Sequence, residues 1–504
     1  MRPGFPLIHR LGRSLLRTIR ANDLLLFALL FPACVRTIPE ILAGPWPLGT
    51  DTVWIYAPFI KNVETHGWTS AFIDVGWPRT APVVFLLFAG VSSLSNADPF
   101  LLTKAAGPIF HGLLVFAMYY FARHGLGWDR RRCLLVVLVS SLYFVPLRFS
   151  WDMYKNALGY ATFILALTWL RQPRDGMNNR LVLALAAISI FSSELTAILW
   201  IGFGGILLLY DARREKKWNP YLLLVAAIAF LASLLYSGIL IAPVPPVSPL
   251  APLPNNRTFL YNYVGADDDL YTYPGIGAVY VHVAVLSAII LGPLLPLAWA
   301  GFFPERRLRV WTLILAAAAF SILIVPFAAF PLWHRWLFML AFPALIFAVN
   351  CLARLPRYVV ALFFAVLVIL CLTFVTLPPE LALPYYASPY TVPYVPSSMI
   401  QNTVPIYDSP EIVAALRWLN EQHFENSTLV TPIAFLGWSE LYSQGLAVYG
   451  YVKAWQVDNG NFSAFQHVFL LYWAPSQGWY DPNLMPLGMV PLYMSGRIAI
   501  YEQV

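Results

Sequence analysis

Charge is scarce in this sequence: Asp, Glu, Lys and Arg make up 11% of its 504 residues, while 59% of the residues are hydrophobic. Soluble domains carry about 25% charged residues, so the composition excludes an ordinary soluble globular protein. Long hydrophobic stretches recur from Leu24 to Leu377, which is typical of helices that cross a bilayer. The sequence therefore predicts a polytopic α-helical membrane protein.

Cysteine is also rare, and no internal repeat is visible. The four cysteines lie in or at the ends of hydrophobic stretches and are predicted to be small buried side chains without a disulfide framework; they are Cys34, Cys133, Cys351 and Cys371. Transporters built from inverted repeats contain two related halves. The lack of a visible repeat argues against that architecture.

The basic residues fall in clusters between the hydrophobic stretches, and their placement predicts the orientation of the chain. The clusters lie at Arg2–Arg20, Arg123–Arg132, Arg171–Arg180, Arg213–Lys217, Arg306–Arg309 and Arg354–Arg357. Because cytoplasmic loops carry an excess of Lys and Arg, placing all of these clusters inside requires about 11 spans. This arrangement makes the N-terminus cytoplasmic and the C-terminal segment extracytoplasmic in the cell membrane.

The predicted spans are 24–43, 101–122, 133–149, 157–171, 181–193, 195–210, 219–243, 276–302, 310–330, 335–352 and 358–377. The hydrophobic segment 81–94 does not fit this topology as a span, because it would place the cluster at Arg130–Arg132 outside. We interpret it as a re-entrant or interfacial helix of the first external loop.

The chain is predicted to have three parts. Residues 1–377 form the membrane domain, with a first external loop at 44–100 and a second at 244–275; residues 378–408 are a linker rich in Pro and Tyr, and 409–504 form a small α/β domain. In that domain, Ser409-Pro410-Glu411 is predicted to start an amphipathic helix whose apolar face runs from Ile412 to Leu419. Strands are predicted at Leu429–Ile433 and Arg497–Gln503.

Two acidic residues, Asp51 and Asp152, lie on short connections that reach the same predicted outer face. Carboxylates are costly to keep near lipid, so a pair at one face suggests a catalytic cleft. Structural alternatives remain open for both. Asp51 could stabilise the turn after Gly49-Thr50, and Asp152 could interact with the N-terminal dipole of the helix that begins near Lys155. Arg36 and Glu40, four residues apart in the first span, are predicted to form an ion pair.

The order of these features resembles the GT-C glycosyltransferases, which use polyprenyl-phosphate-linked sugars. Asp51 matches the acid of the first external loop in that superfamily, and Asp152 matches the second acid, between spans three and four. Arg79, in Trp77-Pro78-Arg79-Thr80-Ala81-Pro82, lies where aminoarabinose and related transferases carry a basic residue for the lipid phosphate. The resemblance, which includes the protein O-mannosyl transferases, covers most of the chain.

The segment from Ala414 to Gly450 is similar to the start of the external domain of oligosaccharyltransferases, on the residues Trp418-Leu419-Asn420 and Gly437-Trp438. The Trp-Trp-Asp-Tyr-Gly peptide-binding motif of those enzymes is absent, and other residues occupy the region around Thr431–Trp438. This departure argues against glycosylation of protein sequons.

The resemblance implies a membrane glycosyltransferase that moves a hexosyl or pentosyl group from a polyprenyl-phosphate donor to a lipid, glycan or protein acceptor, with inversion. In this chemistry a carboxylate removes the acceptor proton and cations stabilise the leaving phosphate. Asp51 is the predicted base, and Asp152 orients it, binds the acceptor or shares a divalent cation (Mg²⁺ or Mn²⁺) with it. The predicted phosphate-binding residues are Arg79, Lys155 and Arg335, with Lys104 and Arg148 as secondary candidates.

Predicted substrate contacts are Trp54, Tyr56, Trp151, Glu194 and His334. Glu194 and the predicted phosphate-binding residue Arg335 have structural alternatives. Glu194 could be a first-turn acid of its helix, and Arg335 could extend into an aromatic belt at the interface. The rival function is a lipid or polysaccharide transporter or a membrane scaffold. Acids at one interface, rather than in mid-membrane, favour the enzyme, and no nucleic-acid partner is expected.

Overall fold

The computed structural model describes residues 23–170, 176–215, 219–238, 240, 248–251, 275–324, 332–377, 404–475, 477 and 485–504. The N-terminal basic cluster, almost all of the second external loop and most of the predicted linker lie outside these residues. The description below refers to the described residues only.

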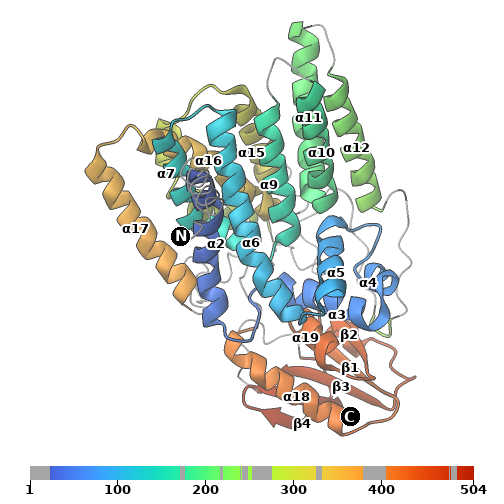
Figure 1. Cartoon of the computed structure of the whole chain (residues 1–504). Helices are drawn as coiled ribbons and strands as arrows, with labels where there is room; N and C mark the ends of the chain where they lie inside the picture. The colour runs from blue at the N-terminus through green and yellow to red at the C-terminus, as the bar shows by residue number, and fades with distance from the viewer. Residues whose placement is uncertain are drawn as a thin grey trace, which may run out of the picture.

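The larger part of the molecule is a bundle of apolar helices (Figure 1). Its long members are α2 (Asp23–Leu42), α6 (Pro99–Tyr120), α11 (Glu194–Glu215), α15 (Arg306–Ile324), α16 (Trp333–Leu352) and α17 (Arg357–Thr376). Its shorter members are α7 (Arg130–Leu142), α8 (Phe144–Phe149), α9 (Tyr154–Trp169), α10 (Gly176–Ser192), α12 (Pro220–Tyr236), α13 (Ile276–Leu291) and α14 (Leu295–Ala300), and a π-helical turn, η2 (Phe121–Gly125), extends α6.

Among the described residues, 6 helices are long and apolar enough to cross a membrane, and these contain the six long helices or most of their length. Helix α16 is the most central of them, because 89% of its most apolar stretch of 18 residues is buried. Next to it, the Tyr160 ring packs edge-on against Trp311 and Phe342. The Tyr160 hydroxyl donates to the Met339 carbonyl over 2.7 Å. A multi-pass membrane protein follows from these lengths and compositions; the predicted topology of about 11 spans stays a prediction.

Two predicted spans are wrong as single helices. The segment 276–302 is divided into α13 and α14. The segment 133–149 is divided between α7 and α8, because Tyr143 between them has ψ of 132° and leaves the helical conformation. The Tyr143 hydroxyl donates to the Ile290 carbonyl over 2.6 Å, which ties this break to α13. The break turns the short helix α8 and the residues after it toward the acidic site.

The first loop contains the π-helix η1 (Thr52–Tyr56) and the helices α3 (Ala57–His66), α4 (Trp68–Asp74) and α5 (Val83–Ser95). Helix α5 matches the segment that did not fit the predicted topology. Its 13 residues reach only about 20 Å, less than the hydrocarbon thickness of about 30 Å. Asp98 ends the loop as the N-cap of α6, accepting from the backbone N–H groups of Phe100 and Leu101.

Residues 404–504, called the C-terminal unit below, lie against the first-loop helices (Figure 1). The unit contains η5 (Ile406–Asp408), α18 (Ser409–Glu421), β1 (Ser427–Pro432), α19 (Ile433–Tyr442), β2 (Ala447–Tyr451), α20 (Trp455–Asp458), β3 (His467–Trp473), β4 (Met489–Ser495) and β5 (Ile498–Gln503). The strands form one sheet in the order β2-β1-β3-β5-β4.

Strand β1 pairs in parallel with both β2 and β3, and Val430 lies opposite Tyr449 and Leu470. Strands β5 and β4 add an antiparallel edge. The structure contains the strands predicted near residues 429–433 and 497–503. The predicted helix also forms, but Asp408 rather than Ser409 is its N-cap residue.

Close backbone contact joins the C-terminal unit to the first loop. A Cβ on Gly437 of α19 would lie 1.9 Å from the Val53 carbonyl oxygen, so only glycine allows α19 to touch η1 in this way. The Lys61 ammonium on α3 donates to the Leu441 carbonyl, and Trp438 packs edge-on against Trp46 at 5.7 Å. The helix α19 thus helps to hold the loop that carries Asp51.

Candidate active site

Asp51 and Asp152 come together although 101 residues separate them in the sequence. Asp51 is the N-cap residue of η1, and Asp152 lies in the turn between α8 and α9. The backbone N–H of Asp51 donates to Oδ2 of Asp152 over 3.3 Å. Gly49 allows this approach, because its φ is +98° and a Cβ there would lie 2.4 Å from Cβ of Asp152.

Asp152 is held by a buried ion pair. Nη1 of Arg148 donates to Oδ1 of Asp152, and the two side chains are 0% and 1% exposed. Both carboxylate oxygens of Asp152 therefore have partners, one in Arg148 and the other in the Asp51 backbone. The N-cap of α9 is Met153, so Asp152 does not cap α9. Its carboxylate instead binds Arg148 and the Asp51 backbone. Its geometry suits a residue that positions the Asp51 segment.

Asp51 has a different environment. Its Oδ2 lies 3.4 Å from Nη2 of Arg335 at the start of α16, and its side chain is 12% exposed. Burial raises the pKa of Asp51 above the ordinary aspartate value, Arg335 opposes that rise, and the nearby carboxylate of Asp152 adds to it. A carboxylate with a raised pKa is a stronger base. The geometry thus leaves Asp51, and not Asp152, as the carboxylate that can meet a substrate.

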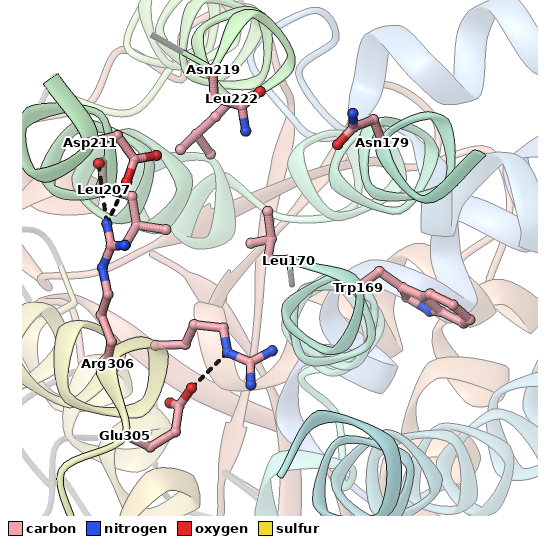
Figure 2. Close-up of a pocket in the computed structure, with 10 residues that line it drawn as sticks. Trp169, Leu170, Asn179, Leu207, Asp211, Asn219, Leu222, Glu305 and Arg306 are labelled. Carbon is pink, nitrogen blue, oxygen red and sulfur yellow. Dashed lines mark hydrogen bonds and ion pairs between the residues drawn. The ribbon is translucent and has the colours of Figure 1, made fainter. Parts of the chain in front are cut away.

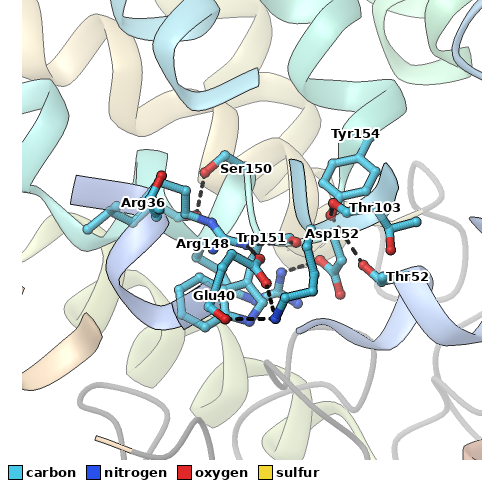
Figure 3. A network of polar contacts seen from close by, with 12 residues as sticks. Arg36, Glu40, Thr52, Thr103, Arg148, Ser150, Trp151, Asp152 and Tyr154 are labelled. Carbon is cyan, nitrogen blue, oxygen red and sulfur yellow. Dashed lines mark hydrogen bonds and ion pairs between the residues drawn. The ribbon is translucent and has the colours of Figure 1, made fainter. Parts of the chain in front are cut away.

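A second charged network holds the turn before Asp152 (Figure 3). Arg36 and Glu40 of α2 form the predicted ion pair, with Nη2 and Oε1 2.8 Å apart. Arg36 also donates to the Trp151 carbonyl over 3.2 Å, and its guanidinium carbon lies 4.3 Å from the centroid of the Trp151 ring. Gly107 makes room for it, since a Cβ there would lie 2.8 Å from Nη2 of Arg36.

Lys104 of α6 completes this network. Its ammonium donates to the carbonyls of Glu40 and Trp46 over 2.7 and 2.9 Å and lies 3.4 Å from the Glu40 carboxylate. These contacts use its hydrogens inside the protein. Lys104 therefore closes the end of α2, which weighs against its secondary candidacy for donor phosphate.

The other predicted cations lie around Glu194, the first residue of α11. The Lys155 ammonium is 2.8 Å from Oε1 of Glu194, which also accepts from the Ala81 backbone N–H over 2.9 Å. Arg79 precedes that contact by two residues, and it packs against Gly238, where a Cβ would lie 1.8 Å from Nη2. Nε of Arg79 is buried and has no hydrogen-bond partner in the described part of the chain. Glu194 thus fits its structural alternative while it holds a predicted phosphate-binding residue.

The predicted substrate contacts separate into buried and accessible residues. Tyr56, Trp151 and His334 are 1–2% exposed. The Tyr56 hydroxyl accepts from the Lys155 backbone N–H over 3.3 Å, and Trp151 packs beneath Arg36. This burial weighs against substrate contact for all three. Trp54 is 36% exposed.

Trp54 lines a narrow cleft between the first loop and the C-terminal unit. The cleft is lined by Pro47, Gly49, Thr50, Val53, Trp54, Val404, Ser409, Ala434, Gly437 and Trp438. Because Gly49 and Thr50 directly precede Asp51, the cleft reaches the segment that carries the accessible carboxylate.

The donor set does not fit a shared divalent cation. Mg²⁺ and Mn²⁺ prefer several oxygen ligands, whereas both oxygens of Asp152 and one of Asp51 already face cations or a backbone N–H. In the described part of the chain, no group of three or more His, Cys, Asp and Glu side chains is placed to hold a metal. The predicted Asp51–Asp152 metal site therefore has no support from the residues present.

Sequence reasoning missed the roles of Arg148, Tyr154 and Gly49. Arg148 was a secondary phosphate candidate, although its spacing of four residues from Asp152 is the spacing of a helical ion pair. Tyr154 joins three segments: its hydroxyl donates to the Thr103 carbonyl over 2.9 Å and lies 3.4 Å from the Thr52 hydroxyl. The sequence carried no comparable signal for that contact.

Comparison with known proteins identifies solved structures with a similar fold. No protein-family model and no curated protein sequence matches the chain. The structure is similar to the crystal structure of ArnT from Cupriavidus metallidurans bound to undecaprenyl phosphate, with a TM-score of 0.52 and 10% identity over 94% of this chain and 97% of that one. A cryo-EM structure of the arabinofuranosyltransferase AftD from Mycobacteria aligns with a TM-score of 0.47 and 11% identity, over 94% of this chain and 39% of that one. The first likeness, at this identity, establishes the fold: the chain shares the fold of ArnT, in agreement with the predicted resemblance to GT-C glycosyltransferases.

Proposed function

We propose that the chain is a membrane glycosyltransferase that moves a sugar from a polyprenyl-phosphate donor to an acceptor hydroxyl at the extracytoplasmic face. The observation that carries this proposal is the ion pair of the accessible Asp51 carboxylate with Arg335, 3.4 Å away. The neighbouring Asp152 has partners for both of its carboxylate oxygens. The fold shared with ArnT, whose structure contains undecaprenyl phosphate, supports the class of donor.

The proposed reaction is a single displacement. Asp51 accepts the proton of the acceptor hydroxyl while that oxygen attacks the anomeric carbon, and the bond from this carbon to the donor phosphate breaks. The electron pair leaves with the phosphate, so the configuration of the sugar inverts. Asp152, held by Arg148, keeps the Asp51 segment in place.

Arg79, Lys155 and Arg335 are the proposed partners of the donor phosphate. Charge-assisted hydrogen bonds from such groups stabilise the charge that develops on a leaving phosphate. Arg79 has a buried Nε without a partner among the described residues, and Lys155 is 19% exposed beside Glu194. These cations take the role that a divalent cation would otherwise fill, so we expect transfer to persist in EDTA.

The test is a transfer assay with the purified full-length chain in liposomes, a panel of radiolabelled polyprenyl-phosphate sugars and cell-envelope acceptors. We expect label to move from the lipid to an acceptor in the wild type but not in Asp51→Asn. Movement of intact donor across the bilayer, unaffected by Asp51→Asn and without transfer, would support the transporter instead.

A further inference from the structure

A polar pocket of about 260 Å³ lies at the end of the bundle opposite to the acidic site. It is lined by Trp169, Leu170, Asn179, Leu207, Asp211, Asn219, Leu222, Glu305, Arg306 and Arg307. Helix α9 separates the two places: Asp152 directly precedes its first turn, and Trp169 is its last residue. Its 16 residues span about 24 Å, so the pocket is independent of the proposed reaction.

Two ion pairs build the wall of this pocket (Figure 2). Nε of Arg307 lies 2.8 Å from Glu305, and its two other nitrogens donate to the carbonyls of Leu167 and Gly125 over 2.8 and 2.7 Å. Each nitrogen of Arg307 thus has a partner in the protein. Glu305 also accepts from the Leu308 backbone N–H over 2.6 Å, so this acid is neutralised and capped.

Arg306 is held in place but keeps hydrogen-bond capacity. Its Nη2 lies 2.8 Å from the buried Asp211 carboxylate, and its guanidinium carbon lies 3.6 Å from the centroid of the Tyr210 ring. Its side chain is 32% exposed and lines the pocket. Its Nε is buried and has no partner among the residues that the structure describes, so the pocket is served by the terminal nitrogens of the guanidinium. A fixed guanidinium with spare donors is well suited to bind an oxyanion.

Two amides face Arg306 from the other side of the pocket (Figure 2). The Asn219 amide oxygen accepts from the Tyr221 backbone N–H over 3.2 Å as the N-cap of α12, and its NH₂ group has no acceptor within the described part of the chain. Asn179 lies in the first helical turns of α10. The pocket therefore combines available N–H donors with carboxylates that are already neutralised.

The surrounding charge is also positive. Arg180, Arg213 and Arg309 are exposed near the same ends of α10, α11 and α15, and this is the end that the basic clusters predict to be cytoplasmic. Basic pockets between membrane helices on that side are suited to anionic lipid headgroups. We propose that this pocket binds a phosphate ester, supplied by the headgroup of a membrane phospholipid in the cytoplasmic leaflet.

The test measures ligand binding to the purified full-length chain in phosphate-free detergent, by native mass spectrometry and thermal shift. The probes are short-chain phosphatidylglycerol, the diacylglycerol of the same chain length, and glycerol 3-phosphate. We expect phosphatidylglycerol to bind and to raise the melting temperature, while diacylglycerol does neither. Equal affinity for glycerol 3-phosphate would keep the phosphate site but assign it to a soluble phosphate ester.

The variants Asn179→Asp and Asn219→Asp place a negative charge in the pocket. Asp caps a helix as well as Asn and is favourable near a helix N-terminus, so both variants should fold. Each should weaken phosphatidylglycerol binding by about tenfold or more, because a hydrogen bond to a charged group contributes this much. Asn178→Asp adds the same charge to the neighbouring residue, which does not line the pocket, and should leave binding unchanged. Equal binding by all three variants would overturn the proposal.

Discussion

The segments that carry Asp51 and Asp152 meet at one point but treat their carboxylates differently. Around Asp152, Arg148 and a backbone N–H occupy both oxygens, and the side chain is 1% exposed. Around Asp51, the side-chain contact among the described residues is one longer ion pair to Arg335, and the side chain is 12% exposed. Two acids that look equivalent in the sequence are thus a positioning residue and a candidate base.

The largest expected effect concerns the base. Asp51→Asn should lower the transfer rate by about 100- to 10,000-fold, because the amide cannot accept the acceptor proton. The backbone N–H that reaches Asp152 is unchanged, so the variant should retain the melting temperature of the wild type. Transfer kinetics and thermal unfolding measured on the same preparation check both statements. Full activity would remove Asp51 from the reaction.

The next effect sharpens the contrast through stability. Asp152→Ala should lose about 3–5 kcal/mol of stability, because it leaves the Arg148 charge buried and unpaired. The double variant Arg148→Met, Asp152→Leu removes both charges and should recover much of that stability, but not the activity. Thermal unfolding in detergent measures the difference. Wild-type stability of Asp152→Ala would show that the pair does not hold this turn.

The smallest of these effects concerns the donor. Arg79→Ala should weaken use of the polyprenyl-phosphate donor by about 1.5–3 kcal/mol, the contribution of a charge-assisted contact. The assay is the donor concentration dependence of transfer, with Arg131→Ala as an exposed arginine control at the other end of the bundle. If the two variants have the same donor dependence, Arg79 does not bind the phosphate, and Lys155 and Arg335 are then the candidates for this role.

Local patterns predicted much of this architecture. The hydrophobic stretches matched helices because apolar length dictates membrane helices, and the spacing of Arg36 and Glu40 predicted their ion pair correctly. The break at Tyr143 was missed although Pro146, in the first turn of α8, has no backbone N–H with which to continue the helix from α7. The hydrogen bond from the Tyr143 hydroxyl to Ile290, which ties the break to α13, has no local signal in the sequence. Other contacts between distant segments were not predicted for the same reason, because a single sequence does not encode them locally.

The candidate site was predictable in part. The free-energy cost of keeping carboxylates near lipid pointed to Asp51 and Asp152, and the structure brings these two residues together. Their unequal roles depend on Arg148 and on the close approach that Gly49 permits, where a Cβ would lie 2.4 Å from Asp152. The buried positions of Tyr56, Trp151 and His334 were likewise not visible, because an aromatic residue beside an acid suits both a core and a sugar-binding surface.

The pH dependence of transfer tests the role of Asp51 most directly. Because burial raises the pKa of Asp51 above the ordinary value of 3.8, kcat/KM should fall as the pH drops through that raised pKa and the carboxylate becomes protonated. The residual activity of Asp51→Asn should lack this acidic limb, while Asp152→Asn should retain it at lower overall activity. An acidic limb that persists unchanged in Asp51→Asn would contradict the account, because another group would then be the base.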